Sequence, residues 1–293
     1  MRPELSQAAE LLSQNTPESI DKAIGLLQDT VFSFSMKMCG HREDAEDTMQ
    51  DVLIGSLKHL SKLQGPGELA AWLYTVTRNR CRHMRRVRPE TSAQRFSLDE
   101  LLPDDAELHR LVKESSKSPE AEVLRTEQSS LLHESVLKLP ASLRLVLVLH
   151  DMEELSAEEI AGILNLQVGT VRVRLHRARL TLRQEMARVL RGLPAQPQTK
   201  KKSVAKRPNE CRKLFASLSE YIDARIDPNI CKQMRAHIES CPECIAFLKD
   251  LRTVIDRCRS FPTACSPAVA QRLRYMLAKE YLRLTGKQEH SAT

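Results

Sequence analysis

Residues 155–183 read LSAEEIAGILNLQVGTVRVRLHRARLTLR and carry the clearest structural signal in the chain. Ser156 followed three residues later by Glu159 predicts a capping box at the start of a helix. Gly169 is expected to take a left-handed turn conformation, and Thr170 to cap a second helix that begins there. The stretch therefore predicts two helices joined by a tight turn.

The second of these helices combines an apolar stripe with a basic surface. Val171, Leu175, Ala178 and Leu182 recur at helical spacing and form one face to be buried. The remaining surface is expected to carry Arg172, Arg174, His176, Arg177, Arg179 and Arg183. Arginines on such a helix suit phosphates and guanine edges in the major groove of DNA. The pattern favours a DNA-binding helix-turn-helix over the alternative, a helical pair with a solvated basic face.

Composition sets the class of protein. The 293 residues are enough for two or three small domains, and only 9 glycines with 4% aromatic residues favour an all-α fold. A net charge of +7 fits a polyanionic partner, either nucleic acid or an acidic membrane surface. The chain shows no long apolar run and no signal pattern at residue 1, so we expect a cytoplasmic protein without a membrane partner.

Two helices are predicted near the start, over residues 17–39, ended by Gly40, and over residues 42–60. The second carries Asp44, Asp47 and Asp51 on one stripe. An acidic face in a basic protein is suited to dock on a basic protein surface, the alternative being a solvated face.

A loop is predicted over residues 61–68, SKLQGPGE, followed by a helix over residues 69–88. This helix begins with Trp72 and Tyr74 and ends in the basic run RNRCRHMRRVR. Aromatic rings beside arginines are what capture of unstacked bases requires. The alternative is that both rings are core residues.

Three segments, HREDAEDTMQDVLI, AWLYTVTRNRCRHMRR and LPASLRLVLVLHDMEELSAEEIAGILNLQVGTVRVRLHRARLTLR, resemble the two domains of an extracytoplasmic-function (ECF) sigma factor of bacterial RNA polymerase. The resemblance covers residues 17–190 and implies binding to core RNA polymerase through Asp44, Asp47, Gln50 and Asp51. It implies contacts with the minus-10 promoter element, and a flipped base near residues 61–68, through Trp72, Tyr74, Arg78, Asn79, Arg82, Arg85 and Arg86. It implies contacts with the minus-35 element through Thr170, Arg172, Arg174, His176, Arg177 and Arg179. Glu154 departs from the family, which usually has glycine there.

The expected organisation is a first sigma domain at residues 1–88, an extended linker at 89–118 and a second sigma domain at 119–193. A flexible basic linker at 194–209, PAQPQTKKKSVAKRPN, would lead to a last domain at residues 210–286.

The last domain carries a metal-ligand pattern. Cys211 precedes the spacing H-x3-C-x2-C formed by His237, Cys241 and Cys244. Four such ligands fit a closed, structural zinc site. The alternatives are a redox-active Cys-Pro-Glu-Cys pair or unrelated buried thiols. Cys231, Cys258 and Cys265 are not accounted for by this site.

The zinc pattern is similar to the zinc-binding anti-sigma domain, which implies intramolecular contact with the sigma domains, regulation in cis and a response of the zinc thiolates to oxidants. No catalytic set of residues is found, so the chain is not expected to be an enzyme. Two other functions remain open: a helix-turn-helix repressor or activator that does not bind core polymerase, and a metal or thiol sensor with a vestigial sigma part.

Overall fold

The computed structural model describes residues 2–87, 101, 103, 105–115, 125–189, 209–225, 227–261, 263 and 265–284. Every regular element in these ranges is helical, which confirms the predicted all-α class. None of the described helices is both long and apolar enough to cross a bilayer. The helices group into two compact units, which we describe separately.

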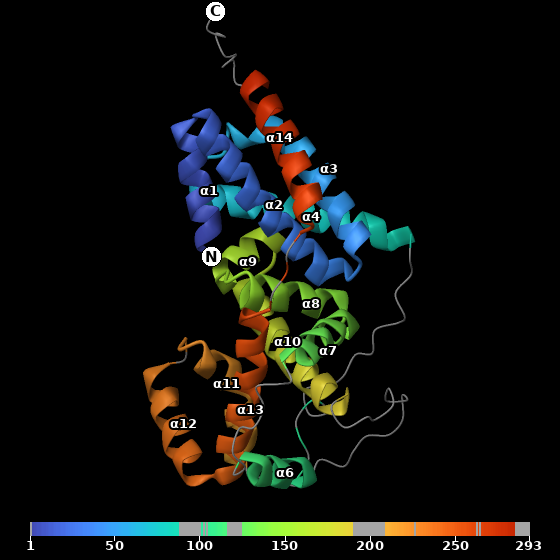
Figure 1. Ribbon diagram of the computed structural model, residues 1–293. Helices are drawn as coiled ribbons and strands as arrows, with labels where there is room; N and C mark the ends of the chain where they lie inside the picture. Colours follow the sequence, from blue (N-terminus) through green and yellow to red (C-terminus); the bar gives the residue numbers. More distant parts are fainter. Residues whose placement is uncertain are drawn as a thin grey trace, which may run out of the picture. The chain divides into compact units, whose positions relative to one another are not determined.

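Seven elements that are not consecutive in the chain form the first unit (Figure 1). They are α1 (Pro3–Gln14), α2 (Pro17–Cys39), α3 (Arg42–Leu60), α4 (Gly65–Val87), the π-helical turn η1 (Val148–Met152), α9 (Ala157–Leu164) and α14 (Pro267–Leu284). The predictions for α2 and α3 are confirmed at both ends.

Local signals explain the bounds of α2. Thr16 accepts a hydrogen bond from the Ser19 amide, Ser19 accepts one in return, and Pro17 occupies the first turn, where a missing amide hydrogen costs nothing. The helix ends at Gly40, which has φ 82 and donates its amide to the Met36 carbonyl. Only a residue that tolerates the left-handed region can close the helix in this way.

The core of the first unit lies between α2 and its neighbours. Phe32 and Phe34 of α2 are buried, and the Phe34 and Tyr74 rings meet edge to face at 5.2 Å. The terminal helix α14 packs on α2 and α3 and buries Leu273 and Leu277 there. The first unit thus combines the N-terminal helices with the C-terminal one.

Among the described residues, seven helices belong to the second unit. They are α6 (Asp105–Ser115), α7 (Arg125–Lys138), α8 (Ala141–Leu147), α10 (Val168–Val189), α11 (Asn209–Ile222), α12 (Pro228–Ser240) and α13 (Pro242–Arg259). Its core gathers apolar residues of α6, α10, α11, α12 and α13, with Phe215 and Phe247 edge to face at 5.1 Å.

The expectation of extended chain over residues 89–118 is wrong where α6 forms. Leu108 of α6 and the preceding Leu101 are buried in the core of the second unit, and Leu111 packs against it. This apolar anchoring outweighs the polar composition of the segment.

The two consecutive helices α9 and α10 confirm the capping box and correct the turn. The Ser156 hydroxyl accepts from the Glu159 amide, and the Glu159 carboxylate accepts from the Ser156 amide. The left-handed residue is Asn165, with φ 52, because an asparagine side chain tolerates that conformation. Gly169 and Thr170 lie inside α10, which begins earlier, at Val168. Likewise, α4 begins at Gly65, inside the loop expected over residues 61–68.

Candidate functional site

The apolar stripe of α10 is buried as predicted, with Val171, Leu175, Ala178 and Leu182 at most 2% exposed. Arg177 is exposed, and Thr170, Arg172 and Arg174 are partly exposed. The expectation of a fully exposed basic surface is wrong for His176, Arg179 and Arg183, which are buried. The reason is that acidic and polar groups from elsewhere in the second unit pair with them.

Arg179 is held by α11 and by the turn that follows it. Its side chain is 0% exposed, and its two Nη atoms donate to the two carboxylate oxygens of Asp223 at 3.0 and 2.8 Å. Nη1 also reaches the Ser219 carbonyl at 3.4 Å. Two parallel bonds to one carboxylate are the geometry that arginine also uses with a phosphate.

Arg183, one turn further along α10, is held by two acids. Its Nε donates to Asp250 of α13 at 2.6 Å, and its Nη2 donates to Glu107 of α6 at 2.9 Å. The guanidinium also lies over the Phe247 ring, 4.7 Å from its centroid. Charge pairing and a cation–π contact together offset the cost of burying this group.

His176 is the third buried basic residue of α10, after Arg179 and Arg183. Its Nδ1 lies 2.9 Å from the Ser219 hydroxyl. Burial, together with the positive charges of Arg179 and Arg177, lowers the pKa of His176 to about 4. The imidazole is therefore neutral near pH 7, which avoids a second buried positive charge beside Arg179 in the contact between α10 and α11.

The acidic residues of α3 lie on the surface of the first unit. Asp47 and Asp51 are exposed, and Asp44 and Gln50 are partly exposed. Asp51 forms an ion pair with Arg80 of α4, with both side chains more than a third exposed. The structure thus brings the predicted acidic residues together on one accessible face of α3.

Helix α4 places the residues predicted for the minus-10 element in different environments. Trp72 is partly exposed and stacks on His59 of α3, with ring centroids 5.4 Å apart. Tyr74 is 1% exposed, in line with the core alternative. Arg78 donates to the Ile163 carbonyl of α9 at 3.2 Å, and Asn79 is exposed. The side chains of Arg82, Arg85 and Arg86 lie outside the described part of the structure.

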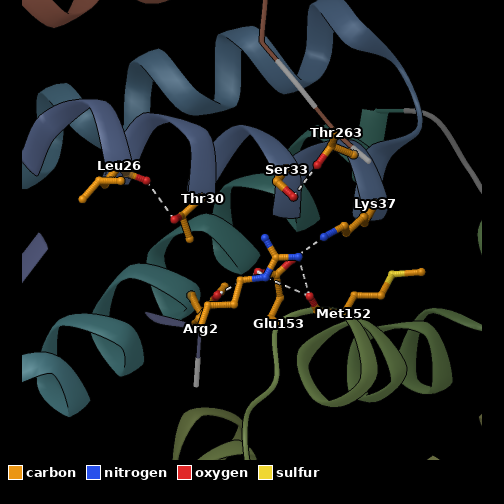
Figure 2. A network of polar contacts seen from close by, with 9 residues as sticks. Arg2, Leu26, Thr30, Ser33, Lys37, Met152, Glu153 and Thr263 are labelled. Carbon is orange, nitrogen blue, oxygen red and sulfur yellow. Dashed lines mark hydrogen bonds and ion pairs between the residues drawn. The ribbon is translucent and has the colours of Figure 1, made fainter. Parts of the chain in front are cut away.

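A buried ionic network, missed by sequence reasoning, surrounds Glu153 (Figure 2). Its Oε1 accepts from the Lys37 ammonium at 2.7 Å, with both side chains 0% exposed. Its Oε2 accepts from the Tyr74 hydroxyl at 2.9 Å, and Arg2 Nε lies 3.4 Å from the same oxygen. Burial, reinforced by the charge of Glu153, raises the pKa of Tyr74 well above its usual value.

Arg2 and an unusual backbone conformation fix Glu153 in place. Arg2 donates from Nε and Nη2 to the Met152 carbonyl at 2.9 and 2.6 Å (Figure 2). The next residue, Glu154, has φ 59, in the region that favours glycine. This explains why the resembling family usually has glycine there. No local pattern around Lys37 or Glu153 reveals the network, because its members come from four distant segments.

A second candidate site lies where α12 meets α13. The ligand atoms of His237, Cys241 and Cys244 all lie within 4.8 Å of one another, and Cys244 Sγ is 3.4 Å from His237 Nε2. A tetrahedral zinc ion with ordinary bond lengths separates a sulfur and a nitrogen ligand by about 3.5 Å, so the three residues fit a zinc site. Cys211 belongs to α11, but its side chain lies outside the described part of the structure.

The other cysteines predicted to lie outside the zinc site do not join this cluster. Cys258 is buried in α13, Cys231 is half-buried in α12, and Cys265 lies in the first unit. Burial raises the pKa of the Cys265 thiol, which keeps it protonated.

Comparisons with known proteins match three segments of the chain. The sigma-70 region 2 model matches residues 24–89, the sigma-70 region 4 model matches residues 129–182, and a zinc-finger model matches residues 211–244. The ECF RNA polymerase sigma factor SigW of Bacillus subtilis is 28% identical over 163 residues, which are 56% of this chain and 86% of that protein. The ECF RNA polymerase sigma-E factor of Escherichia coli K12 is 31% identical over 139 residues, which are 46% of this chain and 70% of that protein.

The helical fold, the basic helix α10 after a capped helix and the ordered sigma matches define the class: a transcription factor of the sigma-70 type. More narrowly, the chain belongs to the ECF RNA polymerase sigma factor family and carries a zinc-finger domain toward its C-terminal end. The resemblance seen in the sequence is confirmed.

Proposed function

We propose that this protein binds core RNA polymerase and directs it to promoters, where it opens the DNA strands for initiation. The observation that carries the proposal is the presence of sigma-70 regions 2 and 4, in this order, in one chain. The catalytic steps of RNA synthesis would belong to the polymerase and not to this chain. A protein that acts together with RNA polymerase would be located in the cytoplasm.

Core polymerase would be bound by the α3 face that carries Asp44, Asp47, Gln50 and Asp51. The exposure of Asp47 and Asp51 supports this assignment, since charged groups on a surface steer a partner of opposite charge. The ion pair between Asp51 and Arg80 is solvent-exposed and therefore easily exchanged for a partner's cation.

Promoter DNA would be contacted by α4 and α10. For the minus-10 element we propose Trp72, Tyr74, Arg78, Asn79, Arg82, Arg85 and Arg86, and for the minus-35 element Thr170, Arg172, Arg174, His176, Arg177 and Arg179. The exposed Arg177 and the partly exposed Arg172 and Arg174 can reach DNA directly. Arg179 and His176 would have to leave α11 first.

Zinc would be held by His237, Cys241 and Cys244, with Cys211 as fourth ligand. The spacing of the three described ligand atoms supports this, as does the matching zinc-finger model. Four protein ligands leave no open position, so the ion would hold α11, α12 and α13 together. A response of these thiolates to oxidants is a further part of the proposal.

Regulation in cis would act on α10. The guanidinium groups of Arg179 and Arg183 donate hydrogen bonds to the carboxylates of Asp223, Asp250 and Glu107. DNA phosphates would accept from the same two arginines in the same way. Because α11 and α13 belong to the zinc-finger part of the chain, we propose that this part covers the portion of the minus-35 surface formed by His176 and Arg179 until it is displaced.

The test is run-off transcription with core polymerase on fragmented genomic DNA from the source organism. We expect the full chain to support initiation, and the double variant Asp47→Lys/Asp51→Lys to lose both initiation and co-purification with core polymerase. The double variant Glu10→Lys/Glu18→Lys changes the charge equally on α1 and α2 and should retain both activities. Absence of core binding by the unaltered chain at every salt concentration would reject sigma function in favour of a conventional repressor or activator.

A further inference from the structure

The segment Val148–Leu166 packs within the first unit on the face of α4 that we assign to the minus-10 element. Glu153 bonds to the Tyr74 hydroxyl, and the Ile163 carbonyl accepts from Arg78. Tyr74 is 1% exposed in this arrangement. The Tyr74 ring also meets Phe34 of α2 edge to face at 5.2 Å, so its burial is shared with the core of the first unit and the segment holds its hydroxyl. The contact of Arg78 with a carbonyl competes with a contact to phosphate.

The groups that α4 meets here have the chemistry of a nucleic-acid strand. Glu153 offers a carboxylate where a phosphate oxygen could lie. Ile163 lies at the C-terminal end of α9, where unpaired carbonyls give the helix a partial negative charge. A carboxylate and a carbonyl oxygen of one protein segment therefore contact two side chains predicted to hold the DNA strand.

The buried pair of Lys37 and Glu153 makes this docking specific. Both side chains are 0% exposed, and Arg2 fixes the same turn through the Met152 carbonyl (Figure 2). A buried ion pair gives little net stability by comparison with apolar packing, but an arrangement that buries either charge without its partner is costly. The pair of Lys37 and Glu153 therefore selects this arrangement of the segment over other packings.

We propose that Val148–Leu166 is a built-in competitor of single-stranded DNA for α4, locked in place by Glu153. While the segment is docked, it engages the Tyr74 hydroxyl and the Arg78 guanidinium, and use of these two groups in strand capture requires the segment to leave. The inference rests on the proposed sigma function for the identity of the DNA strand. It is distinct from the covering of α10 by α11 and α13, because every contact it uses lies in the first unit.

The sharpest test is Arg2→Ala in the full chain. Arg2 donates no side-chain cap to α1 and is not among the proposed DNA contacts, so its loss weakens the docking without unfolding α1. Removing a positive charge should by itself weaken DNA binding. The competitor model predicts the opposite, since an apparent affinity rises with the fraction of molecules in the competent state.

Two measurements are made on each variant: amide hydrogen exchange, and the affinity for a short fluorescein-labelled single-stranded DNA of mixed sequence. For Arg2→Ala we expect faster exchange in residues 148–166 and an affinity raised by about tenfold. The control Lys22→Ala removes the same charge from an exposed site on α2 and should leave exchange unchanged and lower the affinity slightly. Equal or weaker DNA binding by Arg2→Ala, when exchange shows the segment released, would overturn the proposal.

A second pair of variants tests the buried ion pair of Lys37 and Glu153 directly. Glu153→Gln should release the segment and raise the DNA affinity more than Glu154→Gln, which removes the same charge at an exposed neighbour. If Glu153→Gln unfolds the first unit, the decision rests on Arg2→Ala. Unchanged exchange of residues 148–166 in both Arg2→Ala and Glu153→Gln would also reject the lock. Failure of sigma function would instead appear as no binding of core polymerase by any variant, with the exchange results unaffected.

Discussion

The contact between Arg179 and Asp223 offers a quantitative test of regulation in cis. Replacement of Asp223 by Asn keeps the shape of the side chain and removes the charge that neutralises a guanidinium of 0% exposure. Breaking a buried ion pair from one side costs about 3–5 kcal/mol. The lower value applies, because Asp223 is 11% exposed and the Ser219 carbonyl still accepts from Arg179. A loss of about 3 kcal/mol shifts the balance between covered and uncovered α10 by about 150-fold.

Two assays report this shift in Asp223→Asn. Amide hydrogen exchange in α11 should accelerate by a factor of that order, because the helix separates from α10 more often. Run-off transcription with core polymerase should rise, because Arg179 and His176 become available to the minus-35 element. The matched control is Asp256→Asn on α13, whose side chain is 70% exposed and whose loss should change neither result. If α11 exchange in Asp223→Asn equals that in the control, the pairing does not hold the two helices together.

Three further predictions concern single residues. The pKa of His176 is about 4 in the folded protein against an ordinary 6.5. The neutral imidazole therefore contributes its full share to the free energy of unfolding above pH 6.5, and this share is lost as the pH falls toward 4. At pH 5 the loss in the free energy of unfolding is about 2 kcal/mol, which urea unfolding can measure. For His176→Gln, the free energy of unfolding should change correspondingly less between pH 7 and pH 5. An equal change in the variant and the unaltered chain would contradict the role given to His176. Cys244→Ser should lose bound zinc in metal analysis, whereas Cys258→Ser, a buried thiol of the same helix, should keep it. Ser156→Ala should lower the free energy of unfolding by about 1 kcal/mol, because the cap of α9 is lost. The control Ser13→Ala replaces an exposed serine and should leave the free energy of unfolding near that of the unaltered chain.

Local patterns were sufficient to predict α2, α3 and the capping box that begins α9. The Ser156 box and the apolar stripe of α10 follow from residues only a few positions apart, and both are present. The end of α9 was predicted less well, because Asn165 can take the left-handed conformation that we expected of Gly169. Which of these two residues takes the left-handed conformation depends on small differences in conformational energy.

Burial of the basic residues could not be predicted from the sequence near α10. Arg183 is paired with Asp250 and Glu107, which are far away in the chain. Periodicity assigns an arginine to the polar surface and contains no information on which distant acid reaches it. The same limit applies to Lys37 and Glu153, whose pairing depends on the packing of η1 against α2. The acidic face of α3 was predictable because all its members belong to one helix.

The buried pairs also indicate what can uncover the DNA-binding helices. Salt screens exposed charges over about 10 Å at 0.1 M but affects buried pairs much less. Moderate salt should therefore weaken DNA binding through the exposed Arg177 while the pair of Arg179 and Asp223 stays formed. A partner with different affinities for the covered and uncovered states is needed to shift the balance.

Core polymerase can act as this partner, because the proposed docking residues Asp47 and Asp51 are exposed in the structure and Asp223 is not part of that face. If core polymerase binds the covered and uncovered states equally, it cannot uncover α10, and Asp223→Asn should leave the affinity for core polymerase within about threefold of the unaltered chain while transcription rises. If core polymerase is the partner that uncovers α10, linkage makes the affinity rise together with transcription. Titration of core polymerase with the two proteins, without DNA, decides whether core polymerase shifts the balance or another partner does.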